Sequence, residues 1–219
     1  MKLSIDPALK KKCPSVALEL VTAQVRTTDS SLELLGEMYS CEEGILKSVD
    51  PRALLDAPAI SATRAGYRAL GKDPARYRGS AEALLRRLVS GKHFPNVNCV
   101  VDIINLLSVE SRLPIGLYDL VHVQGDIVFR AGKKGETYKG IGKFDLNLED
   151  LPVFADGAGP YGSPTSDSER TMVTPSTENV AAIFISFGGP QPLEAWGQRM
   201  KALLEKYAAG REILIEIVQ

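Results

Sequence analysis

Three polar side chains share one face of an otherwise apolar segment, and their spacing predicts a binding pocket. Asn98, Asp102 and Asn105 stand four and three residues apart, so a helix would place them in one line. An unpaired polar group costs about 1–3 kcal/mol when it is buried. Each member of the line must therefore bond to nearby loop backbone or face a wet pocket, and we expect the line to border a substrate pocket.

A second wall of that pocket is predicted in the loop at residues 156–171, DGAGPYGSPTSDSERT. Its Gly, Ser, Thr and Asp residues expose backbone N–H groups and small hydroxyls to an incoming ligand. Its candidate pocket residues are Gly162, Ser163, Asp167 and Arg170. The Arg170 guanidinium would hold an anion such as a carboxylate or a terminal phosphate. A surface loop without a ligand would have much the same composition.

A basic segment precedes the apolar helix and predicts contact with a phosphate-rich ligand. Residues 64–92 carry eight Lys/Arg against two acidic residues, although the whole chain has a formal net charge of −1. Such a local field steers polyanions even on a nearly neutral protein. The candidate RNA-binding residues are Arg64, Arg68, Lys72, Arg76 and Arg78. The alternative is a set of ordinary solvated helix faces.

The sequence contains no familiar catalytic motif, since GxSxG, HExxH, a Walker loop and a GxGxxG that joins a strand to a helix are all missing. His93 and His122 are weak candidates for a base, and Cys99 belongs to an apolar helix where a thiol is usually inert. The three cysteines are far apart and form no CxxC pair. We therefore expect neither a metal site nor a cofactor. Any reaction would have to rely on positioning and electrostatics.

Length and composition indicate one globular domain over residues 1–219. The chain is 44% hydrophobic and 24% charged, which is ordinary for a globular protein. Its first residues lack an apolar run of signal-peptide length, and no uncharged apolar stretch reaches about 18 residues. We therefore expect a cytoplasmic protein without a membrane partner. No sequence feature sets its oligomeric state.

The secondary structure expected around these residues mixes strands and helices without regular alternation. Helices are expected at residues 30–40, 80–88, 97–108 and 191–209, with further short helices punctuated by Pro51, Pro58 and Pro74. Strands are expected at residues 2–5, 16–25, 120–123, 127–131, 137–139, 153–155, 171–173 and 180–187, and the final ILIEIV is expected to be a buried strand. This order predicts the α+β fold class.

The residues from the apolar helix onward resemble a known family. The stretch NVNCVVDIINLLSVESRLPIGLYDL, followed by a strand and AGKKGETY, is similar to the third and fourth domains of the bacterial phenylalanyl-tRNA synthetase β subunit. The preceding YRALGKDPARYRGSAEALLRRL resembles free-standing relatives of that module, which lack a synthetase core. The resemblance covers residues 64–187. Its most specific words are VVDIINL, Pro114 with Tyr118 and Asp119, and Gly135 with Glu136.

The resemblance implies an α+β body with mixed and antiparallel sheets in a sandwich-like layer packed with helices. It also implies a tRNA partner and hydrolysis of a mischarged aminoacyl ester in trans. The family's editing histidine and glutamate correspond to Gly116 and Ile183 here, so no catalytic residue is identified. The pocket frame implied by the family consists of Asn98, Asp102, Asn105, Tyr118 and Asp119 with the loop at residues 162–171.

Three functions therefore follow as hypotheses from the sequence. The first is an aminoacyl-tRNA deacylase that acts in trans. The second is a non-catalytic tRNA- or RNA-binding module, indicated by Gly116 and Ile183 at the editing positions. The third is a small-molecule-binding protein that uses the pocket alone, in which case the basic segment is merely solvated. A steep salt dependence of tRNA binding separates the first two from the third.

Overall fold

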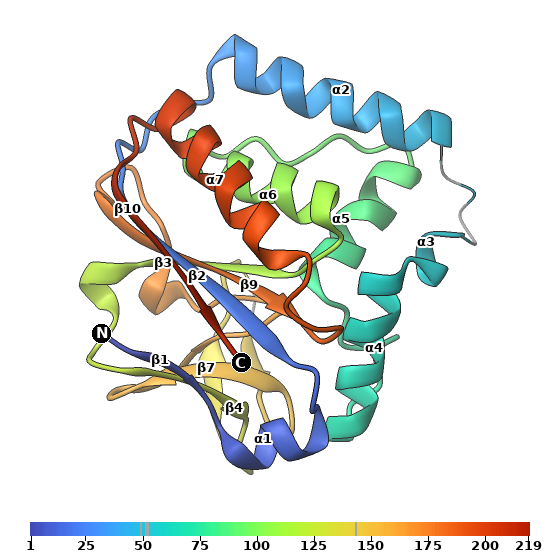
Figure 1. Ribbon diagram of the computed structural model, residues 1–219, viewed down its shortest axis with the longest axis vertical. Coiled ribbons are helices and arrows are strands. Elements are labelled where there is room, and N and C mark those ends of the chain that lie inside the picture. The colour runs from blue at the N-terminus through green and yellow to red at the C-terminus, as the bar shows by residue number, and fades with distance from the viewer. Residues whose placement is uncertain (49, 51–52, 143) are drawn as a thin grey trace.

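The computed structural model describes residues 1–48, 50, 53–142 and 144–219 (Figure 1). The helices are α1 (Pro7–Lys12), α2 (Leu32–Ser48), α3 (Ala53–Asp56), α4 (Pro58–Leu70), α5 (Ser80–Val89), α6 (Cys99–Ser111) and α7 (Leu193–Tyr207), with 3-10 turns η1 (Leu120–His122) and η2 (Glu169–Thr171). The strands are β1 (Leu3–Ile5), β2 (Ala17–Gln24), β3 (Ile115–Asp119), β4 (Ile127–Ala131), β5 (Thr137–Lys139), β6 (Asp145–Asn147), β7 (Pro152–Asp156), β8 (Gly159–Gly162), β9 (Asn179–Ser186) and β10 (Arg211–Val218).

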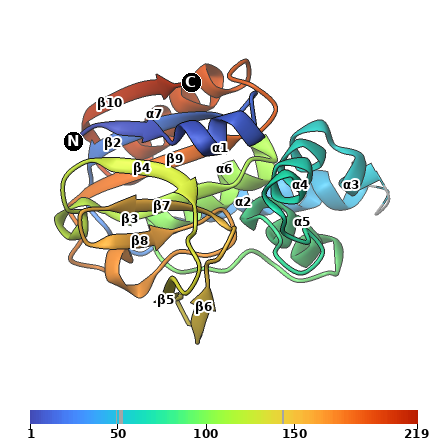
Figure 2. The same ribbon diagram turned by 90° about the horizontal axis from the view of Figure 1, so that it is seen from below.

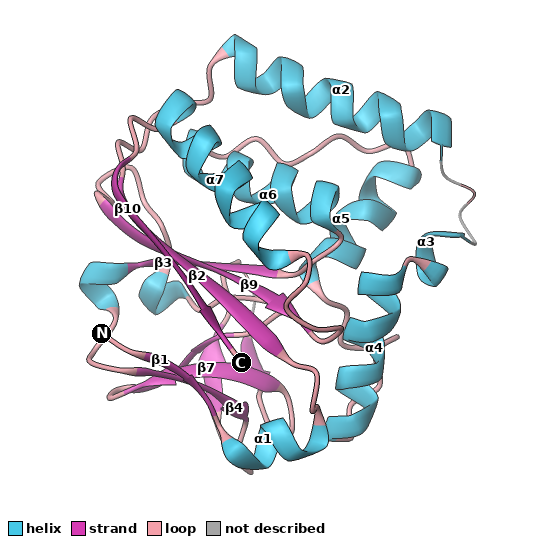
Figure 3. Ribbon diagram, viewed as in Figure 1, coloured by secondary structure: helices cyan, strands magenta, loops and turns pink. Residues whose placement is uncertain are grey.

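Two four-stranded sheets and a layer of helices stack on one another (Figure 3). The central sheet has the order β10-β2-β9-β3 and is antiparallel throughout. The second sheet has the order β1-β4-β7-β8, in which β1 runs parallel to β4. The small β5–β6 hairpin projects from the body (Figure 2). The predicted α+β class, with sheets in a sandwich-like layer packed with helices, is confirmed.

Alternation along β2 explains why the central sheet is covered on both faces. Ala17 and Val21 belong to the core shared with helices α2, α5, α6 and α7. Leu18 and Leu20 point to the opposite face and pack against the second sheet. Successive side chains of a strand point to opposite faces, so a strand whose consecutive residues from Ala17 to Val21 are all buried is covered on both sides.

Helix α6 is buried on nearly every side, as its composition predicts. The Asn98 side chain caps it by accepting a hydrogen bond from the Val101 N–H at 3.0 Å. The helix ends at Arg112, which adopts a left-handed backbone conformation with φ 63°. The chain then reverses into β3, where Gly116 and Tyr118 are both buried.

Helix α4 presents part of the basic segment to solvent. Pro58 lies in its first turn, where no backbone N–H is needed, and Gly71 ends it with φ 96°. Its inner side buries Tyr67 and Leu70, which leaves Arg68 on the exposed side. The helix and the turn after it therefore display the cations predicted to contact phosphate.

Most expected elements are confirmed. The strands predicted at residues 127–131 and 137–139 coincide with β4 and β5, and the helices predicted at residues 80–88 and 97–108 correspond to α5 and α6. The strand predicted at residues 180–187 is β9, shifted by one residue. Pro51, expected between short helices, lies outside the described residues.

Three local predictions are wrong. Residues 120–123 form no strand: residues 120–122 are η1, because the Asp119 carboxylate accepts the Val121 N–H at 3.0 Å and turns the chain. Residues 171–173 form no strand, because Thr171 ends η2 and residues 172–173 have no regular structure. Asp73 caps a turn through the Ala75 N–H at 2.9 Å and does not begin a helix.

The predicted burial of the C-terminal strand is also wrong. Strand β10 lies at the edge of the central sheet and pairs only with β2 within the described chain. Its Leu214 side chain is exposed. The apolar run ILIEIV is therefore only partly buried, and the outer edge of its strand is open to solvent.

Within the described ranges, none of the helices combines the length and the apolar composition that crossing a membrane requires.

Candidate functional site

The predicted polar line on α6 is largely satisfied by internal hydrogen bonds. The Asp102 carboxylate accepts from the Ser30 hydroxyl at 2.6 Å and from the Val97 N–H at 3.1 Å. Burial raises the pKa of Asp102, and these two hydrogen bonds offset part of that effect. Asn98 caps the helix, and Asn105 is half-buried further along it. Asn98 and Asp102 thus bond to nearby protein groups, which is the alternative to facing a wet pocket. Asn98 also lines a cavity of about 310 Å³.

Tyr118 fills the space between β3 and β8. Its ring is fully buried, and a Cβ added at Gly116 or Gly162 would lie 2.0 or 2.3 Å from its hydroxyl oxygen. The hydroxyl donates a hydrogen bond to Asp167 at 3.0 Å, and burial raises the pKa of Tyr118 well above its ordinary value. The ring also meets Tyr161 edge-on, with centroids 4.8 Å apart. Tyr118 is therefore packed on every side and does not line an open pocket.

The two positions that carry editing residues in the resembling family are direct neighbours in this fold. Gly116 on β3 stands opposite Ile183 on β9, and opposite residues of antiparallel strands point to the same face. Neither residue has an ionisable side chain, and the Tyr118 ring occupies the volume beside Gly116. The structure thus brings the two positions together, but the Tyr118 ring and its hydroxyl fill the space beside Gly116.

The loop after β8 is held in one conformation by its own side chains. The Ser163 hydroxyl accepts hydrogen bonds from the N–H groups of Thr165 and Ser166 and donates to the Ser166 carbonyl at 2.9 Å. The Tyr67 hydroxyl bonds to the Thr165 hydroxyl at 2.7 Å, and the Tyr138 hydroxyl donates to the Ser166 carbonyl. Gly162 and Asp167, at the two ends of this loop, both lie beside Tyr118.

Arg170 is occupied by protein groups. Its guanidinium makes two hydrogen bonds of 3.0 Å to Asp156 and donates to the carbonyls of His122 and Gly159. It also lies 5.3 Å from the centre of the Tyr161 ring. Although burial opposes ionisation of Asp156, the hydrogen bonds from Arg170 and from backbone N–H groups leave its pKa lowered. Arg170 therefore links the segments that contain His122, Asp156 and Gly159, and its hydrogen-bond donors are used within the protein.

We expect Arg170→Ala to lower the free energy of unfolding by about 2 kcal/mol, since it leaves a buried carboxylate without its cation. The Asp156 side chain is 0% exposed, so in the folded parent its charge depends on protein partners and not on water. Urea unfolding of the variant and the parent checks this, with the exposed Arg68→Ala as the matched control. Equal stability of the Arg170 variant and the control would contradict the structural role.

The predicted RNA-binding residues divide into paired and available cations. Arg64 is paired, because its guanidinium bonds to both carboxylate oxygens of the buried Glu82 at 3.0 and 3.1 Å. Arg68, Arg76 and Arg78 are exposed and form no ion pair within the described ranges of the chain. The paired Arg64 supports the junction of α4 and α5.

Lys72 and Arg76 share an aromatic support. The Lys72 ammonium lies 4.7 Å, and the Arg76 guanidinium 5.8 Å, from the centre of the Tyr77 ring. Tyr77 in turn packs against the small core that contains Tyr138 and Leu148. These cation–π contacts hold the two charges on one side of the turn that follows α4.

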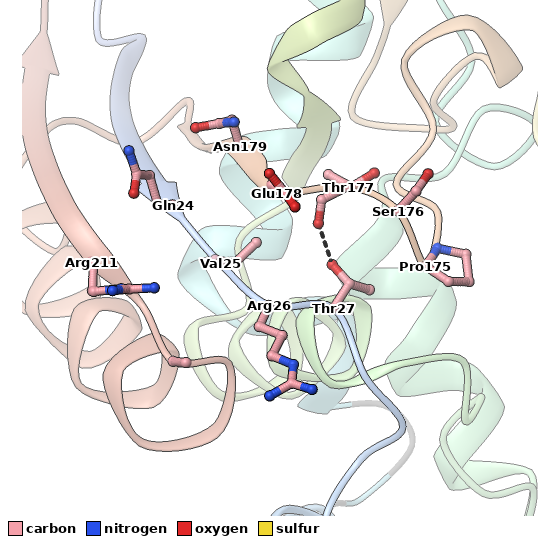
Figure 4. A pocket seen from close by; sticks show the side chains of 11 residues that line it. Gln24, Val25, Arg26, Thr27, Pro175, Ser176, Thr177, Glu178, Asn179 and Arg211 are labelled. Atoms are coloured by element: carbon pink, nitrogen blue, oxygen red, sulfur yellow. Dashed lines mark hydrogen bonds between the residues drawn. The ribbon is translucent and has the colours of Figure 1, made fainter.

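Asp119 contributes to a different region of the molecule. Its carboxylate accepts the Thr177 hydroxyl at 2.6 Å, in addition to the Val121 N–H. Thr177 lines a polar cavity of about 640 Å³ at the ends of β2 and β9 (Figure 4). Sequence reasoning missed this cavity because its residues come from three strands far apart in the chain. The one signal in the sequence that could have indicated the cavity is the pair of polar residues Gln24 and Arg26, two positions apart at the end of a buried strand.

The B3/4 domain family model matches residues 62–191. The chain belongs to the B3/4 domain family. No curated protein shows a match. Among solved structures, the B3/4 chain is similar over 99% of its length to an N-terminal fragment of the phenylalanyl-tRNA synthetase β-subunit from Pyrococcus horikoshii, with a TM-score of 0.51 and 16% identity. It spans 50% of that fragment. The predicted kinship with the synthetase β subunit is confirmed, and so is the fold.

The three candidate groups therefore have different surroundings. The α6 line is bonded internally, the Tyr118–Asp167 cluster is packed, and the cations after α4 are open to solvent. No group of three or more His, Cys, Asp or Glu side chains that could hold a metal ion was found within the described ranges. Charge on an exposed surface is the property of this B3/4 chain that most directly indicates a ligand.

Proposed function

We propose that this B3/4 chain binds tRNA through a basic surface formed by Arg68, Lys72, Arg76 and Arg78. The observation that carries the proposal is the exposure of three guanidiniums on α4 and the turn after it, without an ion-pair partner in the described chain. Such cations bind phosphate oxygens and release counterions from the nucleic acid. Asp73 lies in the same turn, but its carboxylate is engaged by the Ala75 N–H.

The rigidity of the basic surface supports the same proposal. Because Tyr77 fixes the positions of Lys72 and Arg76, less side-chain freedom is lost when phosphate binds. The phosphate backbone supplies affinity and positioning but little sequence information. The proposed function is therefore recognition of tRNA by shape and charge, in one domain over residues 1–219.

Hydrolysis of a mischarged aminoacyl ester in trans is the second candidate function. One observation favours it: the half-exposed Asp167 carboxylate is fixed by the Tyr118 hydroxyl beside a loop of small residues. A fixed carboxylate can orient an attacking water. The filled space at Gly116 and the apolar Ile183 argue against hydrolysis by the family's own pair of positions. Binding is therefore our first proposal.

The double variant Arg68→Glu/Arg76→Glu is expected to bind tRNA at least about tenfold more weakly, because each reversal replaces a phosphate contact with repulsion. The loss should be similar for every tRNA species, and the slope of log K against log salt should fall by about two. Electrophoretic shifts and a salt titration measure both effects. Lys2→Glu/Lys201→Glu makes the same change in net charge elsewhere and serves as the control.

Equal tRNA affinity of the two double variants would contradict the basic surface as the binding site. Binding that is independent of salt would instead support the small-molecule hypothesis. A screen of aminoacyl-tRNAs for accelerated deacylation, run with Asp167→Asn beside the parent, tests the second candidate. Hydrolysis by the parent that the Asp167 variant lacks would add catalysis to the proposed function.

A further inference from the structure

A polar cavity lies where β2 ends and β9 and β10 begin, and no function discussed above uses it. We call it the end-of-sheet cavity. It has a volume of about 640 Å³, within the range of about 300–1,000 Å³ that is common for small-molecule sites. The residues that line it are Gln24, Val25, Arg26, Thr27, Pro175, Ser176, Thr177, Glu178, Asn179, Ala209 and Arg211 (Figure 4).

Strand register places three polar side chains in a row at this cavity. Gln24 on β2 is opposite Arg211 on β10 and opposite Asn179 on β9. Directly opposite residues of antiparallel strands point to the same face of the sheet. The row Arg211–Gln24–Asn179 therefore presents one guanidinium and two amides side by side. The Gln24 amide is further fixed by a 2.8 Å hydrogen bond to Glu212.

Two guanidiniums border the cavity. Arg26 and Arg211 are both exposed, and neither forms an ion pair with another residue in the described ranges. Glu178 is the one carboxylate in the lining, so the lining carries a formal charge of +1. A guanidinium presents paired N–H donors whose geometry matches a phosphate. The charge and donor set thus fit one phosphate group.

The wall opposite these cations is fixed by buried hydrogen bonds. The Thr27 hydroxyl donates to the Thr177 carbonyl at 2.8 Å, and the Thr177 hydroxyl donates to Asp119 at 2.6 Å. The Val25 N–H also donates to the Glu178 carbonyl at 2.8 Å. Thr27, Thr177 and Asp119 are all buried. Asp119 therefore acts as a positioning residue, and the cavity keeps its shape without a ligand.

We propose that the end-of-sheet cavity binds the phosphate group of a nucleotide. The Arg26 and Arg211 guanidiniums hold the phosphate oxygens. The Gln24 and Asn179 amides and the Glu178 carboxylate hydrogen-bond to the sugar or the base. The phosphate belongs either to a free mononucleotide or to an RNA strand, since both present the same group to the two arginines.

This site is separate from the basic surface. The cavity lies at the start of β10, whereas α4 lies at the opposite end of the central sheet (Figure 1). The inference does not rest on the proposed tRNA-binding function, because it uses none of the residues of the basic surface. The two sites are therefore separable by mutation.

Isothermal titration calorimetry of the full chain with adenosine 5′-monophosphate tests the proposal. We expect saturable binding, with adenosine at least about tenfold weaker because it lacks the charge-assisted hydrogen bonds to phosphate. Arg26→Ala/Arg211→Ala should weaken binding by at least about tenfold, and Arg26→Lys/Arg211→Lys should restore only part of it. Both arginines are exposed, so thermal melting should show that the variants are folded.

A single-stranded RNA of twelve nucleotides forms the second arm of the experiment. If the mononucleotide does not bind, but the Arg26/Arg211 variant loses RNA affinity by tenfold, the ligand phosphate is that of RNA. The control Arg68→Ala/Arg76→Ala should leave mononucleotide binding unchanged. The proposal is overturned if neither ligand binds, or if binding is the same in the parent and in Arg26→Ala/Arg211→Ala. That result would leave the basic surface unaffected.

Discussion

Gly116→Ala is expected to lower the free energy of unfolding by about 3 kcal/mol, because the added methyl group overpacks a closed core. Its Cβ would lie 2.0 Å from the hydroxyl oxygen of Tyr118 and 2.6 Å from the ring carbon that bears it. The ring cannot move away easily, since Tyr161, Phe154 and Gly162 surround it. Equilibrium urea unfolding of variant and parent measures the effect.

The helical glycine Gly36 supplies the matched control. Nothing lies within 4 Å of a Cβ added there, so Gly36→Ala should be neutral or should stabilise by up to about 1 kcal/mol through helix propensity. A double-mutant cycle with Tyr118→Leu tests the cause. The cost of Gly116→Ala should fall sharply when the ring is absent. If Gly116→Ala costs the same with and without the ring, Tyr118 does not fill the space beside Gly116.

Periodicity predicts elements well where burial alone decides them. The segments that form α6 and β9 are so apolar that each has to be buried. The predicted buried helix and the predicted buried strand are both confirmed. The strand predicted at residues 120–123 is wrong for a local reason, since the Asp119 side chain competes with strand pairing for a backbone N–H. The predicted burial of β10 is wrong for a global reason. The strand lies at a sheet edge, and strand order depends on pairing between distant segments.

The candidate site shows the same division between local pattern and remote partner. Helical spacing correctly places Asp102 inside the protein, but its partner Ser30 is 72 residues away in the chain. Arg64 and Arg170 look available in the sequence, yet Glu82 and Asp156 pair with them in the fold. A sequence pattern indicates which face a side chain occupies. It does not indicate what the side chain meets there.

The family resemblance named two positions that no residue pattern would single out. Gly116 and Ile183 are the counterparts of the family's editing histidine and glutamate, and β3 and β9 place them directly opposite one another. Composition could not provide this, since neither residue has a chemical function. The same resemblance could not show that Tyr118 would fill the intervening volume, because that depends on the absence of a side chain at both Gly116 and Gly162.

Glu19 is a buried acid whose position follows from strand alternation. It lies on β2 between Ala17 and Val21, so it points into the core under the helices. Its exposed fraction is 0%, and no hydrogen bond of normal geometry reaches its carboxylate oxygens within the described chain. Gly197 leaves room for it in α7, since a Cβ there would lie 2.2 Å from a Glu19 oxygen.

Burial raises the pKa of Glu19 from 4.5 to about 7, although the nearby Gly197 N–H offsets part of the effect and Glu194 adds to it. The folded protein therefore binds a proton that the unfolded chain releases between pH 4.5 and about 7. The contribution of this group to stability is full below pH 4.5 and falls as the pH rises through that window. The total loss is on the order of 3 kcal/mol.

Glu19→Gln is expected to remove this dependence on pH, because an amide of the same shape cannot ionise. At pH 8 the variant should exceed the parent in free energy of unfolding by on the order of 3 kcal/mol, whereas near pH 4.5 the two should be similar. Urea unfolding at a series of pH values measures the difference, with the exposed Glu216→Gln as the control. Parallel pH profiles for Glu19→Gln and the parent would show that the carboxyl ionises as readily in the folded protein as in the unfolded chain, and the buried acid would then have to reach water through movement of α7.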